Sequence, residues 1–315
     1  MDISEQLNLN STTEEEVEPY LEITTALVQK RRSQGRIIFD RFVRNRVAIV
    51  GASFIILLFL FCFAGPIVWR IDPNQNNVLD VSATLAPPAL AHPFGTDDVG
   101  RDTMARFMSG GRVSLLVGLT SMLMALMFGI GIGSIAGYYG GIIDNILMRF
   151  TDVILSIPLY LLLFVLSASF TDGTPKSVIL LIAVFGWTYA ARLVRGEFLA
   201  LKEREFILAS RTIGARNFRL MFRHILPNAA GPIIVNATLL IGTNIILESV
   251  LSYFNFGIKP PDASWGSMIS VGQSLFALDY WLVLFPALGI FLTVLSLNLV
   301  GDGLRDALDP YMTER

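Results

Sequence analysis

The side chain best placed to do chemistry in this sequence is Glu248, the one acid well inside a long apolar segment. A carboxylate there predicts a solute path or a gate, because charge within a bilayer is costly. Glu248 lies roughly 29 Å along its segment at 1.5 Å per residue, near the outer end, where a gate or a structural ion pair is an equal alternative to contact with the solute. Polar residues at membrane depth extend this candidate path, with interhelical hydrogen bonding as their preferred alternative role: Asn236, Asn244 and Asn298.

No other residues form a convincing catalytic or metal-binding pattern. His92 and His224 are too isolated to form a metal-binding pair, and Cys62 is the single cysteine, so no disulfide can form within the chain. The sequence contains no Gly-x-x-x-x-Gly-Lys-Ser/Thr phosphate-binding loop. We therefore predict that the chain is not an enzyme, holds no metal and binds no cofactor of its own.

The stretch 203–227 joins two long apolar segments and is rich in basic residues. These basic residues must lie in water, because charge inside a bilayer is costly. They are Arg204, Arg211, Arg216, Arg219 and Arg223, and Lys202 directly precedes them. Gly214 divides the stretch into two helix-forming parts, and it either caps the first helix in a left-handed conformation or allows two backbones to meet closely. Pro227 suits the first turn of the next helix, because proline has no N–H.

The first helix of this stretch has a compact, partly apolar face formed by Phe206, Ile207, Ala209 and Ser210. Such a face fits the groove of a partner protein. From the spacing alone, an amphipathic helix lying on the lipid headgroups is an equal alternative.

The same stretch resembles the coupling loop of ABC importer permeases, which reads Glu-Ala-Ala, three residues, Gly, nine residues and Ile-x-Leu-Pro. Ala209, Gly214, Leu226 and Pro227 match this pattern, and the departures from it are Leu208, Ser210 and His224. In that family the loop inserts into the ATPase subunit. The resemblance implies the same contact here for Glu203, Arg204, Phe206, Leu208, Ala209, Ser210, Gly214, Arg219 and Pro227.

Two further stretches resemble one subgroup of these permeases, which handles peptides and nickel. Residues 92–115 are similar to its His-x-x-Gly-Thr-Asp-x-x-Gly-Arg-Asp signature. From the residues alone they form a turn and then a helix, with Asp102 and Arg106 four residues apart, and an ordinary surface cap is the alternative. Residues 139–149 carry the subgroup's Tyr-x-Gly-Gly, Asp and Met-Arg, and residues 301–310 resemble its C-terminal ending.

Composition places the chain among all-α polytopic membrane proteins. Of its 315 residues 53% are hydrophobic and 16% charged, whereas soluble domains carry nearer a quarter charged residues. Apolar runs of about 20 residues predict about six transmembrane helices, at 47–69, 113–137, 146–170, 178–199, 229–256 and 280–300. The resemblance implies a type I ABC importer permease (MetI-like) fold.

Three features refine the predicted helices. Gly129, Gly133 and Gly137 repeat every fourth residue, which lets two helix backbones approach closely, within this chain or at a subunit interface. Pro158 is expected to kink the third helix. The fifth helix is longer than a straight crossing requires, so its last turns tilt or leave the membrane.

The predicted domain organisation follows the apolar runs. Residues 1–45 comprise a cytoplasmic acidic tail, helical over 17–28, and a basic amphipathic helix. A first transmembrane helix (46–69) and an extracytoplasmic segment (70–111) follow. The permease core (112–303) includes an outer loop with a short helix at 265–276, and a cytoplasmic C-terminal tail (304–315) ends the chain.

The charge distribution predicts the orientation. Six crossings place both termini on one side together with the basic residues of 30–46 and 202–223, and the positive-inside rule makes that side cytoplasmic. Three arginines on the predicted outer side, Arg101, Arg106 and Arg112, count against this orientation. Three aspartates stand beside them and offset their charge: Asp97, Asp98 and Asp102. The first apolar run starts near Arg46, so we expect no cleaved signal peptide. We expect the bacterial or archaeal plasma membrane.

The resemblance spans residues 36–310 and implies the membrane subunit of an ATP-driven importer of oligopeptides or dipeptides. It implies a second homologous permease subunit, two cytoplasmic ATPase subunits that bind ATP and Mg, an extracytoplasmic peptide-binding protein, a lipid bilayer and no nucleic acid. Nickel or another small solute is the alternative within the family. The alternatives outside it are an ion-gradient-driven secondary transporter, for which no obvious internal repeat is present, and a scaffold or receptor.

Overall fold

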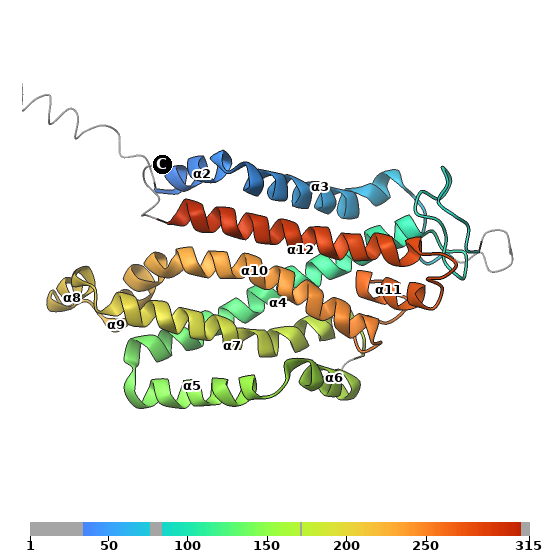
Figure 1. Ribbon diagram of the computed structural model, residues 1–315. Coiled ribbons are helices and arrows are strands. Elements are labelled where there is room, and N and C mark those ends of the chain that lie inside the picture. Colours follow the sequence, from blue (N-terminus) through green and yellow to red (C-terminus); the bar gives the residue numbers. More distant parts are fainter. Residues whose placement is uncertain (1–33, 76–83, 171, 310–315) are drawn as a thin grey trace, which may run out of the picture. The chain divides into compact units, whose positions relative to one another are not determined.

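The computed structural model describes residues 34–75, 84–170 and 172–309, in which every regular element is a helix (Figure 1). The chain divides into two compact units, Met1–Arg41 and Phe42–Arg315. Helix α2 (Gln34–Arg44) occupies most of the predicted basic amphipathic segment. The acidic residues at the N-terminus, with the helix predicted over 17–28, lie outside the described residues.

Five long helices in the described part of the second unit are apolar enough to cross a membrane: α3 (Arg46–Val68), α4 (Thr103–Tyr139), α7 (Pro175–Lys202), α10 (Leu226–Tyr253) with the turns before it, and α12 (Trp281–Leu308). A bent pair, α5 (Gly141–Ser156) and α6 (Leu159–Phe170), meets the same criteria of length and apolar composition when its two helices are taken together, which makes up to six spans. In Figure 1, α4 ends and α7 begins at opposite ends of the helices, so α5 and α6 carry the chain from one end to the other. The prediction of an all-α protein with about six transmembrane helices is confirmed.

Side-chain caps mark where three of the long helices begin. Asn45 caps α3, Asp102 caps α4 and Thr174 caps α7, each through a side-chain oxygen that accepts a backbone N–H. Because Asp102 caps α4, this helix starts at Thr103, ten residues before the predicted residue 113. At the other end of the chain, α12 continues beyond the predicted residue 300 to Leu308. The predicted domain boundaries at 111/112 and 303/304 therefore fall inside continuous helices.

Pro158 breaks the third crossing rather than kinking it. Proline has no N–H and disfavours helical geometry in the residue before it, and Ile157 is accordingly extended, with φ −86° and ψ 131°. The helices on the two sides of the break differ in direction by 83°. The single kinked helix predicted for 146–170 is therefore wrong in this respect, and α5 and α6 are separate helices.

Gly129, Gly133 and Gly137 place the backbone of α4 directly against α7. A Cβ at Gly129 would lie 2.5 Å from the Cβ of Ala190, and one at Gly137 would lie 2.6 Å from the Cβ of Phe198. Both distances are shorter than any ordinary carbon contact, so only glycine fits. The two helices form the most extensive helix pair in the described residues.

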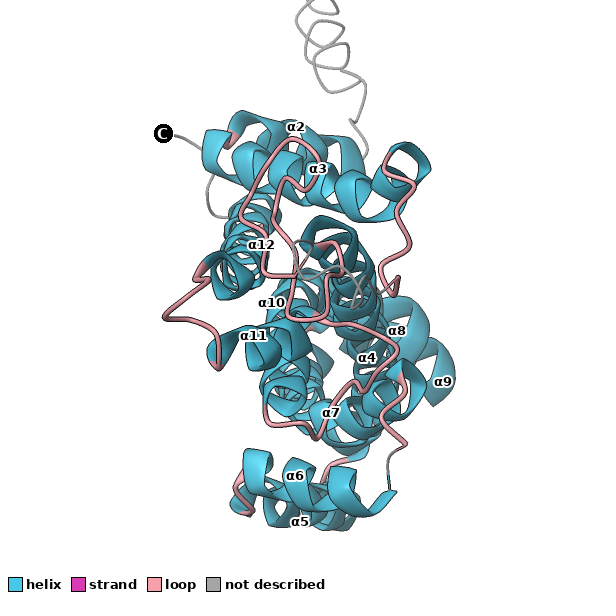
Figure 2. Cartoon of the chain, turned by 90° about the vertical axis from the view of Figure 1, so that its right-hand side faces the viewer, coloured by secondary structure: helices cyan, strands magenta, loops and turns pink. Residues whose placement is uncertain are grey.

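The other helices surround this pair. α3 packs on α12, and α12 on α10, which also contacts α4 and α7. α5 and α6 lie at the margin of the bundle next to α7, as the turned view shows (Figure 2). The short helices α8 (Glu205–Thr212) and α11 (Trp265–Gln273) lie at opposite ends of the bundle (Figure 1).

Candidate functional site

Residues 203–227, which we call the connecting segment, join α7 to α10. α8 is followed by a bend, the single turn α9 (Asn217–Arg219) and the π-helical turn η3 (Leu220–Ile225). Gly214 ends α8 with φ +84°, and a Cβ there would meet no atom within 4 Å. Glycine is therefore needed for its left-handed conformation, as the sequence predicts, and not for space.

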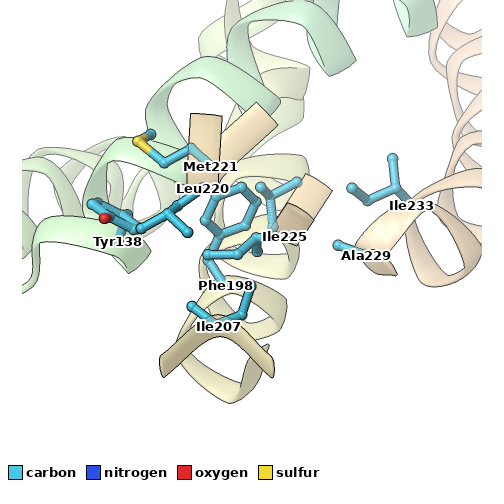
Figure 3. Packing of buried hydrophobic residues seen from close by; sticks show 9 residues of the cluster. Tyr138, Phe198, Ile207, Leu220, Met221, Ile225, Ala229 and Ile233 are labelled. Carbon is cyan, nitrogen blue, oxygen red and sulfur yellow. The ribbon is translucent and has the colours of Figure 1, made fainter. Parts of the chain in front are cut away.

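Apolar side chains anchor the connecting segment to the bundle. Ile207 of α8 and Leu220 and Ile225 of η3 are fully buried. They pack in one cluster with Phe198, near the end of α7, and with Ala229, in the first turns of α10 (Figure 3). α8 and η3 are therefore packed closely against both neighbouring helices.

Tyr138 ties the end of α4 to the same segment. Its hydroxyl donates a hydrogen bond to Oδ1 of Asn217 over 2.8 Å. The guanidinium of Arg211 lies 5.9 Å from the centre of the Tyr138 ring, within the range of a cation–π contact. Three transmembrane helices, α4, α7 and α10, therefore meet the connecting segment.

The opposite side of the connecting segment is exposed. Large apolar side chains reach solvent there, notably Ile213 with 86% and Phe218 with 73% of its surface exposed, together with Phe206, Leu208 and Phe222. All five arginines of the segment are exposed as well. An exposed group of apolar and basic side chains indicates a binding surface for a protein or for a membrane.

The remaining predicted contact residues fall on this segment too. Glu203, Arg204, Ala209 and Arg219 are exposed, and Pro227 is exposed in the first turn of α10. The hydroxyl of Ser210 donates to the carbonyl of Phe206 over 2.8 Å, so it is satisfied within α8.

Glu248 is fully buried between α4, α10 and α11. The hydroxyl of Ser114 donates to its Oε2 over 2.7 Å, and that of Ser252 donates to its Oε1 over 2.6 Å. The Ser114 oxygen accepts the N–H of Trp265, and the Ser252 oxygen accepts that of Ile258, which directs both hydroxyl protons at the carboxyl group. Glu248 thus has serine hydroxyl partners in place of the cation that a structural ion pair would supply.

The three candidate asparagines occupy different environments. Asn244 is buried and donates to the hydroxyl oxygen of Ser121 on α4 over 2.9 Å. The Oδ1 atoms of Asn244 and Asn236 are buried and accept no hydrogen bond from the described residues. Asn298 is exposed on α12. For Asn244 the geometry is that of interhelical hydrogen bonding, which we weighed against solute contact.

Two ion pairs between α5 and α7 escaped the sequence analysis. Arg195 donates to both carboxylate oxygens of Asp144, over 2.5 and 2.6 Å, and Arg192 pairs with Asp152. The available signal was the presence of acids in the third apolar segment and cations in the fourth, at similar distances from their inner ends.

The outer segment is held by a different set of contacts from the one its spacing suggests. Asp102 does not pair with Arg106 four residues on, because it caps α4 and accepts hydrogen bonds from His92 Nδ1 over 2.7 Å and Trp69 Nε1 over 3.2 Å. Arg106 lies instead 3.8 Å from the Asp97 carboxylate. Within the described ranges, no group of three or more His, Cys, Asp or Glu residues could hold a metal.

Two family models match the chain. The model of the binding-protein-dependent transport system inner membrane component matches residues 129–314. That of the N-terminal TM domain of oligopeptide transport permease C matches residues 33–88.

Curated relatives and a solved structure agree with this match. The oligopeptide transport system permease protein OppC of Bacillus subtilis (strain 168) is 41% identical over 86% of this chain and 87% of the relative. The dipeptide transport system permease protein DppC of the same organism is 39% identical over 86% and 83%. The inward-facing methionine ABC transporter MetNI matches with a TM-score of 0.54 and 20% identity, over 65% of this chain and 97% of that chain.

These matches confirm the predicted fold, which is that of a type I ABC importer permease. They also confirm that the chain is an integral membrane protein. They also confirm that the chain is a transport component and not an enzyme. The chain belongs to the family of binding-protein-dependent transport system inner membrane components, the permease subunits of ABC importers.

Proposed function

We propose that this permease forms half of a translocation path for oligopeptides or dipeptides and is driven by ATP hydrolysis in partner subunits. The observation that carries the proposal is the two-sided connecting segment. Its inner side is locked to α4, α7 and α10, while its outer side presents exposed apolar and basic groups. A partner that binds the exposed side and moves would therefore move three transmembrane helices.

The contact with the ATPase subunit is made by the exposed side of α8 and the residues around it. Phe206 and Leu208 supply apolar area, and the exposed charges of Glu203, Arg204 and Arg219 supply ion pairs. An amphipathic helix in the groove of a partner is a recurrent mode of recognition. Ala209 has no side chain beyond Cβ, which permits close approach of the partner.

The full transporter contains a second homologous permease, two cytoplasmic ATPase subunits that bind ATP and Mg, and an extracytoplasmic peptide-binding protein. Support comes from the family description, which names a binding-protein-dependent system. The basic residues of the connecting segment favour the cytoplasmic side by the positive-inside rule. Both termini then lie in the cytoplasm, and the membrane is the plasma membrane of a bacterium or an archaeon.

Peptides are favoured over nickel because the two relatives above are described as oligopeptide and dipeptide permeases. The test reconstitutes the assembled transporter in vesicles and offers a mixture of di- to pentapeptides, with uptake read by mass spectrometry. We expect peptides to accumulate only when ATP and the binding protein are both present. Uptake driven by a proton gradient without ATPase subunits would contradict the proposal, and uptake of nickel alone would replace its solute.

A further inference from the structure

The break between α5 and α6 borders a pocket of about 220 Å³ on one face of α7. Residues 154–159 form one wall, and Phe185, Thr188 and Tyr189 of α7 form the other. Its volume is below the roughly 300–1,000 Å³ of a complete small-molecule site. The pocket can therefore hold a section of a larger solute.

The break leaves backbone oxygens outside the helical hydrogen-bond ladder. Ile157 donates to the carbonyl of Ile154 over 3.3 Å, and Pro158 has no N–H to donate. The carbonyl groups of Leu155 and Ser156, at the end of α5, and of Ile157, just after it, therefore have no intrahelical partner. They provide a row of hydrogen-bond acceptors on the pocket wall.

This irregular backbone is not covered by the chain itself, since Ser156, Ile157 and Pro158 are all exposed. Non-helical backbone at membrane depth is tolerated only where it is buried in protein or lines a water-filled cavity. Contact with lipid is excluded by the same argument. The exposed break therefore faces a partner subunit or an aqueous path, and the pocket beside it favours the path.

Polar groups of α7 point to the same face. Tyr189 has 57% of its surface exposed, and its hydroxyl makes no hydrogen bond with the rest of the described chain. Arg192, one turn further along α7, pairs with Asp152 of α5, and both side chains are about half exposed. An exposed ion pair on apolar helices marks a solute pathway by default, because lipid would not solvate it.

We propose that this pocket is a binding site for the amide backbone of the solute on the translocation path. The free carbonyl groups of the break accept N–H groups of a peptide, and the Tyr189 hydroxyl bonds to a peptide carbonyl. The Arg192–Asp152 pair closes the inner side of the pocket. The inference rests on the proposed function, from which the class of solute is taken.

The first test measures access to the pocket. The assembled transporter carries Tyr189→Cys or, as a second variant, Ser156→Cys, and is placed in nanodiscs with a water-soluble maleimide. Cys62 is fully buried, so the native background from this chain is low. Leu180→Cys is the matched control, because Leu180 is also exposed on α7 but points about 180° away from Tyr189 at 100° per residue.

We expect both pocket variants to react and the Leu180→Cys control to stay unreactive. The peptide that the wild-type transporter accumulates most should then slow labelling about tenfold when present at about ten times its Kd. An analogue of that peptide with one amide replaced by an ester lacks one N–H. One lost hydrogen bond weakens binding about fivefold, so at the same concentration the analogue should slow labelling only about threefold.

The outcomes separate the two proposals. If the wild-type transporter imports peptides but neither pocket cysteine reacts, or the peptide gives no protection, the pocket is off the path and the importer proposal stands. Equal protection by the ester analogue would overturn backbone recognition. Absence of ATP-dependent peptide uptake by the wild type would overturn the proposed function and this inference with it.

Discussion

The two ends of the helix bundle differ in how far their polar and apolar groups are buried within the chain. At the end that carries α11, Glu248, Ser114 and Ser252 satisfy one another in a buried network, and Trp265 is fully covered. At the end that carries α8, only the anchor around Ile207 is buried, and large apolar groups remain in solvent. The first end is satisfied within the chain, whereas the second leaves exposed the surface to which we propose that the ATPase subunit binds.

This difference predicts which property a substitution changes first. At the α11 end, substitutions should lower the stability of the folded chain, because buried groups lose their partners. On the exposed side of α8 they should leave stability unchanged and remove transport, because the lost contact lies between subunits. Four predictions test this contrast, ordered by the size of the expected effect.

Ala209→Asp should have the largest effect. Burying an unpaired carboxylate against the ATPase costs several kcal/mol, so ATP-driven uptake should fall on the order of 100-fold, since 1.4 kcal/mol is about a factor of ten. The thermal midpoint of the isolated permease should not change. Uptake in vesicles and thermal unfolding measure the two quantities, with Ala209→Ser as the conservative control. Normal assembly and transport by Ala209→Asp would show that α8 does not dock there.

Gly266→Ala should lower stability at the other end. The added Cβ would lie 2.8 Å from the backbone carbonyl carbon of Ser249, and such overpacking costs about 1–3 kcal/mol. The matched control is Gly131→Ala on α4, where a Cβ meets nothing within 4 Å. Thermal unfolding of the two variants in the same detergent compares them. Equal midpoints would mean that α11 is not packed tightly against α10.

Glu248→Gln should cost about 1 kcal/mol, the value of one hydrogen bond. In this variant an amide nitrogen replaces one carboxyl oxygen and faces a serine hydroxyl. Both groups are hydrogen-bond donors, so the hydrogen bond between them is lost. Ser114→Ala removes a partner from the other side and should have a similar effect, whereas transport by both variants should persist. If Glu248→Gln keeps its stability and loses transport, Glu248 belongs to the path and the comparison of the two ends fails.

Asp172 should give the smallest effect. Hydrogen bonds from the Ser177 hydroxyl, and from the backbone and hydroxyl of Thr174, lower its pKa to about 2. Because the folded-state pKa lies below the ordinary value of 3.8, its contribution is present above about pH 4 and disappears as the pH falls towards 2. Asp172→Asn should flatten this part of the curve of thermal midpoint against pH. A curve unchanged by the substitution would mean that the hydrogen bonds of Asp172 with Thr174 and Ser177 do not contribute to stability.

The sequence predicted what depends on local pattern. Apolar runs have a length that membrane thickness determines, so about six crossings could be counted. Gly214 and Pro227 act on their own backbone, and α8 accordingly ends at one while the other lies in the first turn of α10. Residues that act only through distant partners could not be read in this way. Asp144 and Arg195 are 51 positions apart, and no spacing rule joins them.

Pro158 shows the same limit within one helix. Its missing N–H predicts a disturbance, but whether α5 and α6 bend slightly or by 83° depends on what surrounds them. Asp102 is a second case, because three donors compete for one carboxylate. The neighbour four residues along is not among them.

The glycine contact between α4 and α7 restricts how the protein can move. The two backbones already touch, so they cannot approach further, and separating them would open an unfilled seam along both helices. We expect α4 and α7 to move together as one rigid body throughout the transport cycle. The flank of this pair carries the break at Pro158, where α5 and α6 differ in direction by 83°, and we expect the movement that admits and releases the solute to be concentrated there.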